Sequence, residues 1–233
     1  MSRAAHIVTF LVSGIASVPA SMAASPNDRD FRDVKATIER NCAECEGGSE
    51  ITFKAAVRML EELVGGGYES AEARELLGDS FGQWAIVYEE DDSYERNALI
   101  ARQREQYQLI LEREPSNATV LDKLALATAD PAEMLALLER AQAIAPDDPR
   151  IAFHLGMVLI NAFNSTEEGL AQLEQAYALA KGGGKAVYGA TLMDAHCRIG
   201  NIRRVTQVQA DLKNTDPSGY PRADCLKISE PSD

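Results

Sequence analysis

Residues 149–181 are the most informative part of the chain and have the sequence PRIAFHLGMVLINAFNSTEEGLAQLEQAYALAK. Apolar residues recur at helical spacing on both sides of a short polar segment, which predicts two helices, 149–163 and 166–181. Gly156 lies in the first helix and Ala176 near the middle of the second. Because both residues are small, we expect the two helices to approach closely and form a helical hairpin.

The same alternation of helices and tight turns extends to both sides of this hairpin. A helix is expected from Asn27 or Asp28 to Arg40, and further helices at 52–64, 70–88, 94–113, 118–128, 131–144, 185–199 and 201–213. In the helix 52–64 one apolar face is predicted, made by Ala55, Ala56, Met59, Leu60 and Leu63. No strand is predicted, since the β-branched runs are short and do not alternate. The pattern predicts an all-α solenoid of stacked helical hairpins, with an irregular helical bundle as the alternative.

Proline recurs where three of these hairpins end, at Pro115, Pro146 and Pro217. A proline ends a helix because it lacks the backbone donor and restricts the residue before it. Together with Leu155-Gly156 and the small residues of the second helices, this pattern resembles the tetratricopeptide repeat (TPR) family, which pairs two antiparallel helices in about 34 residues. The resemblance is clearest over 116–217 and weaker over 69–115.

The N-terminus has the three parts of a secretory signal peptide. Arg3 is basic, residues 7–18 are apolar or small, Pro19 ends the run, and Ser21-Met22-Ala23 offers small residues at a cleavage site. The apolar run is shorter than the roughly 20 residues that span a membrane. We therefore expect export after removal of residues 1–23, to the periplasm of a bacterium with two membranes or otherwise to the outside, with no integral membrane segment left. An uncleaved amphipathic helix is the alternative.

These patterns divide the chain into four parts. They are a signal peptide at 1–23, an N-terminal helical segment with a CxxC motif at 24–68, TPR-like helical repeats at 69–217 and a flexible tail at 218–233.

The chain is strongly acidic, with 23 Lys and Arg against 36 Asp and Glu and a formal net charge of −13. Such a surface repels nucleic-acid phosphates and anionic lipids. We therefore expect a protein or peptide partner and no nucleic acid.

In an exported protein the four cysteines, Cys42, Cys45, Cys197 and Cys225, are expected to pair. Four cysteines allow three connectivities, and local spacing favours Cys42–Cys45 with Cys197–Cys225. A redox role for Cys42 and Cys45 is the alternative, although the neighbouring acidic residues raise the pKa of a thiol and oppose reactivity. Glu46 stands where a haem-attachment motif has histidine, so we expect no haem or other cofactor. A metal site is not predicted either, because His196 and Cys197 are adjacent.

The TPR resemblance implies a concave groove lined by the first helix of each pair, which binds extended or helical peptides. Carried over position by position, the groove candidates are Asp122, Leu126, Arg150, Phe153, Met157, Ile160, Val187 and Asp194. The paired basic and Asn residues that grip a peptide carboxylate in this family are missing at these positions, so an apolar or basic segment is the expected ligand. Residues at the helical spacing of Phe153, Met157 and Ile160 more often belong to the core than to a binding surface, and that alternative stays open.

No Ser-His-acid trio or Gly-x-Ser-x-Gly motif indicates catalysis. The sequence therefore favours a non-catalytic exported adaptor that binds a peptide or protein in its groove. The alternatives are a thiol–disulfide redox protein that uses Cys42 and Cys45, and a structural subunit that self-assembles through uncapped solenoid ends.

Overall fold

A computed structural model of the chain describes residues 25–41, 50–86, 94–215 and 225. Within these residues the chain forms ten α-helices and no strand. The helices are α1 (Pro26–Arg40), α2 (Glu50–Gly65), α3 (Ala71–Ile86), α4 (Tyr94–Arg113), α5 (Ala118–Leu126), α6 (Pro131–Ile144), α7 (Pro149–Phe163), α8 (Thr166–Leu179), α9 (Gly183–Arg198) and α10 (Ile202–Thr215).

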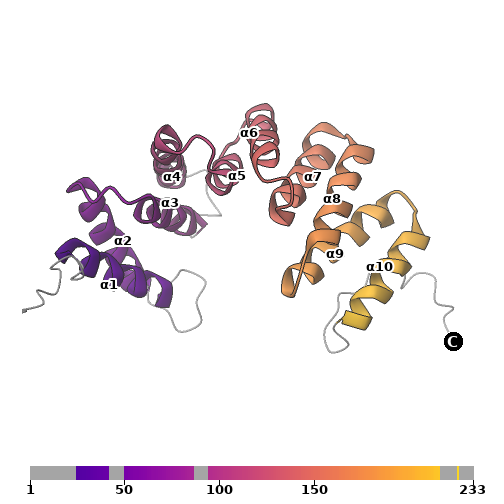
Figure 1. Ribbon diagram of the computed structural model, residues 1–233, viewed down its shortest axis with the longest axis horizontal. Coiled ribbons are helices and arrows are strands. Elements are labelled where there is room, and N and C mark those ends of the chain that lie inside the picture. Colours follow the sequence, from indigo (N-terminus) through magenta and orange to yellow (C-terminus); the bar gives the residue numbers. More distant parts are fainter. Residues whose placement is uncertain (1–24, 42–49, 87–93, 216–224, 226–233) are drawn as a thin grey trace, which may run out of the picture.

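The helices pair in chain order into five hairpins, α1/α2, α3/α4, α5/α6, α7/α8 and α9/α10, and each hairpin contacts the next. Figure 1 shows the hairpins following one another along an arch, with α1 and α10 at its opposite ends. The prediction of an all-α solenoid of helical hairpins is confirmed.

The helix boundaries are encoded locally. Asp130 and Asp148 each precede a proline, and their carboxylates accept hydrogen bonds from backbone N–H groups of α6 and α7, with N–O distances of 3.2 and 2.9 Å. The expected start of the first helix at Asn27 or Asp28 was wrong. Ser25 is the N-cap, because its hydroxyl accepts from the N–H of Asp28 while the Asp28 carboxylate accepts from the N–H of Ser25.

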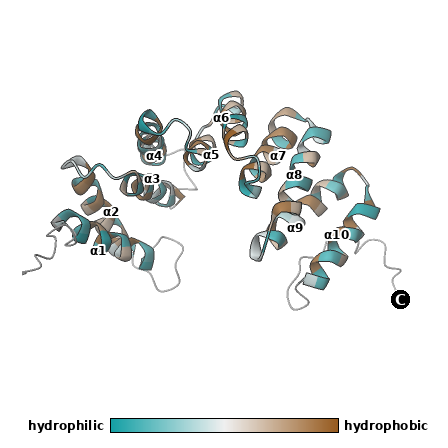
Figure 2. Cartoon of the chain, viewed as in Figure 1, coloured by the Kyte–Doolittle hydropathy of each residue, from teal (hydrophilic) through white to brown (hydrophobic). Residues whose placement is uncertain are grey.

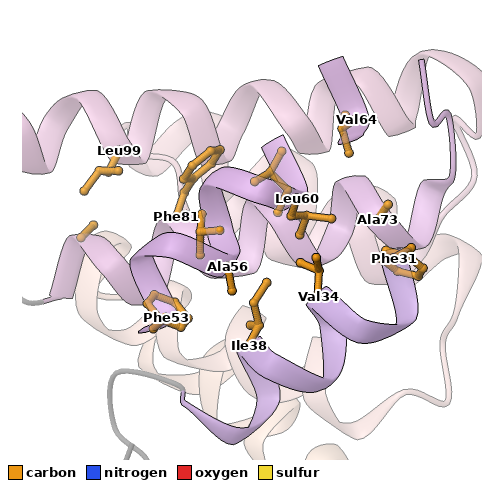
Figure 3. Close-up of a cluster of buried hydrophobic side chains, with 13 residues drawn as sticks. Phe31, Val34, Ile38, Phe53, Ala56, Leu60, Val64, Ala73, Phe81 and Leu99 are labelled. Carbon is orange, nitrogen blue, oxygen red and sulfur yellow. The ribbon is translucent and has the colours of Figure 1, made fainter. Parts of the chain in front are cut away.

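The core is a continuous series of three apolar clusters, centred on α1–α4, α4–α7 and α8–α10. Figure 3 shows the first cluster, in which Val34 and Ile38 of α1 lie near Ala56 and Leu60 of α2. Figure 2 shows hydrophobic and hydrophilic residues alternating around the helices, as expected for helices that bury one face.

The predicted apolar face of the second helix is only partly correct. Ala56 and Leu60 are buried, but Met59 is exposed, and Leu63 is partly buried. Ala55 is exposed as well. The core of the first hairpin instead uses Phe53 and its helical neighbours. The apolar arc of α2 is therefore wider than the surface that its neighbours cover.

Helices α7 and α8 approach each other closely. A methyl group built on Gly156 would lie 2.8 Å from the carbonyl oxygen of Gly169 and 2.9 Å from Cγ of Leu173. The expectation that Gly156 permits close packing is confirmed.

Polar contacts also join the second helices of successive hairpins. They are Arg102–Glu61 between α4 and α2, Arg104–Glu133 between α4 and α6, Gln142–Gln172 between α6 and α8, and Arg204–Glu174 between α10 and α8.

Candidate peptide-binding face

The first helices of the hairpins, α3, α5, α7 and α9, present side chains to one another across the repeats. We call the surface that they form the first-helix face. The eight groove candidates all lie on α5, α7 or α9, and their surroundings differ from one to the next.

Lys123 of α5 connects this face to α3. Its Nζ atom donates hydrogen bonds to Oε1 of Glu75 at 2.7 Å and to Oδ2 of Asp79 at 2.6 Å. Burial lowers the pKa of Lys123, but the hydrogen bonds to Asp79 and Glu75 outweigh burial, so the net shift is upward. Tyr107 of α4 donates to Oδ1 of Asp79 at 2.6 Å, and burial together with this carboxylate raises the pKa of the phenol. The charges of this part of the face are therefore already paired.

Asp122 of α5 connects the face to α7. Only 1% of this residue is exposed. Its Oδ1 atom lies 2.6 Å from Nδ1 of His154, and its Oδ2 atom lies 3.0 Å from Nε of Arg150. Arg150 also donates to Oγ1 of Thr119 at 3.4 Å. The structure thus places the candidate Asp122 beneath the surface, where it positions Arg150 and His154.

Phe153 of α7 and Tyr188 of α9 continue the face with an aromatic contact. Their ring centroids are 4.8 Å apart and the ring planes are inclined by 29°. Burial and the nearby Asp148 carboxylate raise the pKa of Tyr188. Tyr188 was not a sequence candidate. The nearest signal in the sequence is Gly189, the residue that follows Tyr188. A methyl group on Gly189 would lie 2.9 Å from both Tyr177 and Leu212, so this glycine marks a close approach in α9 as Gly156 does in α7.

Met157 and Ile160 are partly buried and pack against the apolar cluster of α8–α10, as Phe153 does. They contribute to the core while keeping an exposed edge. Leu126 and Val187 are much more open, with 52% and 58% of each residue exposed.

Asp194 is also exposed and forms an ion pair with Arg198, one turn further along α9, at 2.7 Å.

Leu126 borders a hollow of about 370 Å³ between α3, α4 and α5, which Ile86 and Ile100 also line. The hollow occurs where α5, with nine residues, is shorter than α3, with 16.

In the structure Cys197 of α9 is paired with Cys225, and Cys225 packs against the α8–α10 cluster. Cys42 and Cys45 lie outside the described residues, so their predicted pairing stays a prediction.

Among the residues that the structure describes, no group of three or more His, Cys, Asp or Glu side chains could hold a metal ion. No helix in the described ranges is both long and apolar enough to cross a bilayer.

The sequence matches no protein-family model and no curated protein. Solved structures nevertheless share its fold. MamA from Desulfovibrio magneticus RS-1 has a TM-score of 0.60 at 16% identity, over 84% of this chain and 100% of that chain. TTC0263, a thermophilic TPR protein of Thermus thermophilus, has a TM-score of 0.56 at 15% identity, over 82% of this chain and 92% of that chain. Yeast Tom70 has a TM-score of 0.58 at 14% identity, over 86% of this chain and 40% of Tom70.

These likenesses concern the fold. They confirm that the chain is TPR-like, an all-α solenoid of the kind that its Leu-Gly and Pro pattern indicated.

Proposed function

We propose that this protein is a non-catalytic exported adaptor whose first-helix face binds a segment of a partner protein. One observation carries the proposal. On this face the charged groups are paired with one another, whereas Leu126, Val187 and the edge of Phe153 leave apolar surface open. A face of this kind favours recognition by apolar contact.

The partner segment that fits best is apolar with basic flanks. The net charge of −13 attracts cationic groups over a range of about a Debye length. Burying an apolar side chain contributes about 1.5–3 kcal/mol. Several such contacts are needed to reach the roughly 8 kcal/mol of a micromolar complex, which suits an adaptor that binds reversibly.

The proposal is tested by selecting 12-residue peptides from a displayed random library on the purified protein and measuring their affinities by fluorescence anisotropy. Val187→Lys and Leu126→Lys each place a charge at an exposed apolar position of the face. Ile144→Lys is the matched control, because Ile144 is 43% exposed and lies on a second helix. We expect at least tenfold weaker binding for the two face variants and wild-type binding for the control. Equal affinities for all three variants would contradict the proposal.

Export is the second part of the proposal, and it rests on the sequence of residues 1–23. When the full chain is produced in a bacterium with two membranes, we expect it in the periplasmic fraction with Ala24 as its first residue, as read by mass spectrometry. We also propose that Cys197 and Cys225 form their bond after export, since thiols pair in oxidising compartments. A full-length chain retained in the cytoplasm would contradict this part alone.

A further inference from the structure

The apolar arc of α2 is wider than its neighbours cover, and one edge of it is left exposed. Phe53, Val57 and Leu60 are buried in the core of the first hairpins. The exposed edge is a ridge that runs along the helix at intervals of four residues, through Ile51, Ala55 and Met59 to the partly buried Leu63. Ile51 is 83% exposed and Met59 57% exposed. An apolar helix edge that its own chain leaves exposed indicates a contact still to be made.

Beside this ridge lies a cavity of about 460 Å³, which we call the N-terminal groove. Its lining comes entirely from the first hairpin, as Asp30, Asp33, Val34 and Thr37 of α1 and Thr52, Ala55, Ala56, Met59, Glu62 and Leu63 of α2. Val34 and Ala56, both labelled in Figure 3, are buried and form its floor. The α2 side runs from Thr52 to Leu63, which are eleven steps apart, or about 16 Å at 1.5 Å per residue, and this matches three turns of another helix.

The charges of the groove gather at one end. The start of α1 lies beside the end of α2, because the Tyr68 ring contacts Phe31 at 5.4 Å and its hydroxyl donates to Asp28 at 3.1 Å. This antiparallel arrangement brings Asp30 and Asp33 of α1 to the same end as Glu62 of α2.

Two features of this end favour contact with a cationic side chain of a polypeptide. The last turn of α2 contains no basic residue, so the negative end of the helix dipole adds to the three carboxylates. Among the described residues no group of three or more acidic, His or Cys side chains could hold a metal ion, and this holds for the three carboxylates here. Carboxylates beside an apolar floor instead match Lys or Arg side chains on a helical ligand.

We propose that the N-terminal groove binds an amphipathic helix of a partner protein, with an apolar stripe packed on Val34, Ala56 and Met59 and basic residues at the end beside Asp30, Asp33 and Glu62. This surface lies on the first hairpin, whereas the first-helix face candidates lie on α5, α7 and α9. The inference therefore stands independently of the proposed function.

The experiment uses a fluorescein-labelled 18-residue helical peptide with leucine at every third or fourth position and three lysines at one end. A second peptide has glutamates in place of the lysines. Binding of each to the purified protein is measured by anisotropy. We expect the lysine peptide to bind, Met59→Lys to weaken it at least tenfold and Asp33→Lys to weaken it severalfold, with Ile144→Lys, which is on α6 and outside both proposed surfaces, unchanged. Because Met59 is exposed, its substitution is expected to leave the circular dichroism spectrum and the urea midpoint as in the wild type.

Three results would overturn the proposal. They are equal binding of the lysine peptide by wild type and Met59→Lys, equal binding of the glutamate peptide, and a change of oligomeric state in Met59→Lys by sedimentation velocity. The last result would identify a second copy of this chain as the occupant of the groove.

Discussion

Replacing Gly156 by valine tests the packing on which the best-formed repeat depends. The new Cβ would lie 2.8 Å from the backbone oxygen of Gly169 and 2.9 Å from Leu173, closer than real Cβ contacts allow. The first of these atoms belongs to the backbone of α8, so the strain is relieved only if the two helices separate. Overpacking costs about 1–3 kcal/mol, and a carbonyl contact belongs at the upper end of that range. Valine regains about 0.4 kcal/mol of helix propensity over glycine. We expect a net loss of about 2–3 kcal/mol.

The assay is urea unfolding followed by circular dichroism at pH 7. With a slope of about 2–3 kcal/mol per molar for a chain of this size, the midpoint is expected to fall by about 1 M. Gly184→Val is the matched control, because a Cβ at Gly184 meets only Tyr188, at an ordinary 3.7 Å. Its expected change is within about 0.5 kcal/mol. A Gly156→Val protein as stable as the control would show that α7 and α8 do not approach in the described way.

Three further outcomes are expected. Cys197→Ser removes a bond that closes a 28-residue separation, so it is expected to cost about 3.5 kcal/mol in the oxidised protein, and an unchanged thermal midpoint would contradict the pairing. The hydrogen bond from Arg204 lowers the pKa of Glu174, and its stabilisation is therefore present above the ordinary carboxyl pKa and lost as the pH falls through the lowered value. Glu174→Gln is expected to flatten the fall of the urea midpoint between about pH 5 and pH 3, and an unaltered slope would contradict this role. Lys123→Met leaves two carboxylates of α3 without their cation and is expected to lower the free energy of unfolding by about 1–2 kcal/mol, measured by urea unfolding. Lys35→Met removes a more exposed ion pair and should lower it by less than about 1 kcal/mol.

The positions of the helices were predictable because their start signals are local. The aspartates before Pro131 and Pro149 act within two residues of themselves, and α6 and α7 begin where those prolines indicate. The start of α1 was equally local, since Ser25 and Asp28 have the spacing of a capping box, but the prediction placed the start at Asn27 or Asp28.

The candidate site was less predictable because its contacts join distant residues. The repeat register located Arg150 and Phe153 on α7, yet it gave no sign that Asp122 is buried. The partner of Asp122, His154, is 32 residues away and approaches it only when two hairpins stack. Tyr188 was missed because its partner Phe153 is on another hairpin, and the two rings meet only when α7 and α9 lie side by side.

The exposed apolar residues of α2 are a second feature that the sequence pattern did not predict. Helical periodicity placed Ala55 and Met59 on the same apolar face as Ala56 and Leu60, since a sequence pattern does not distinguish a face covered by its own chain from one left open. Only the arrangement of α1, α2 and α3 shows that the first hairpin needs fewer apolar residues than α2 contains.

Site-specific photo-crosslinking in the producing cell tests the adaptor proposal at its binding face. A photoreactive phenylalanine analogue is placed singly at Leu126, at Val187 and, as the control, at Ile144, three positions that are exposed and apolar. The account predicts that the first two positions crosslink the same partner segment, identified by mass spectrometry of the crosslinked peptides, and that Ile144 does not. Crosslinking of that partner from Ile144 alone, or equally from all three positions, would contradict it.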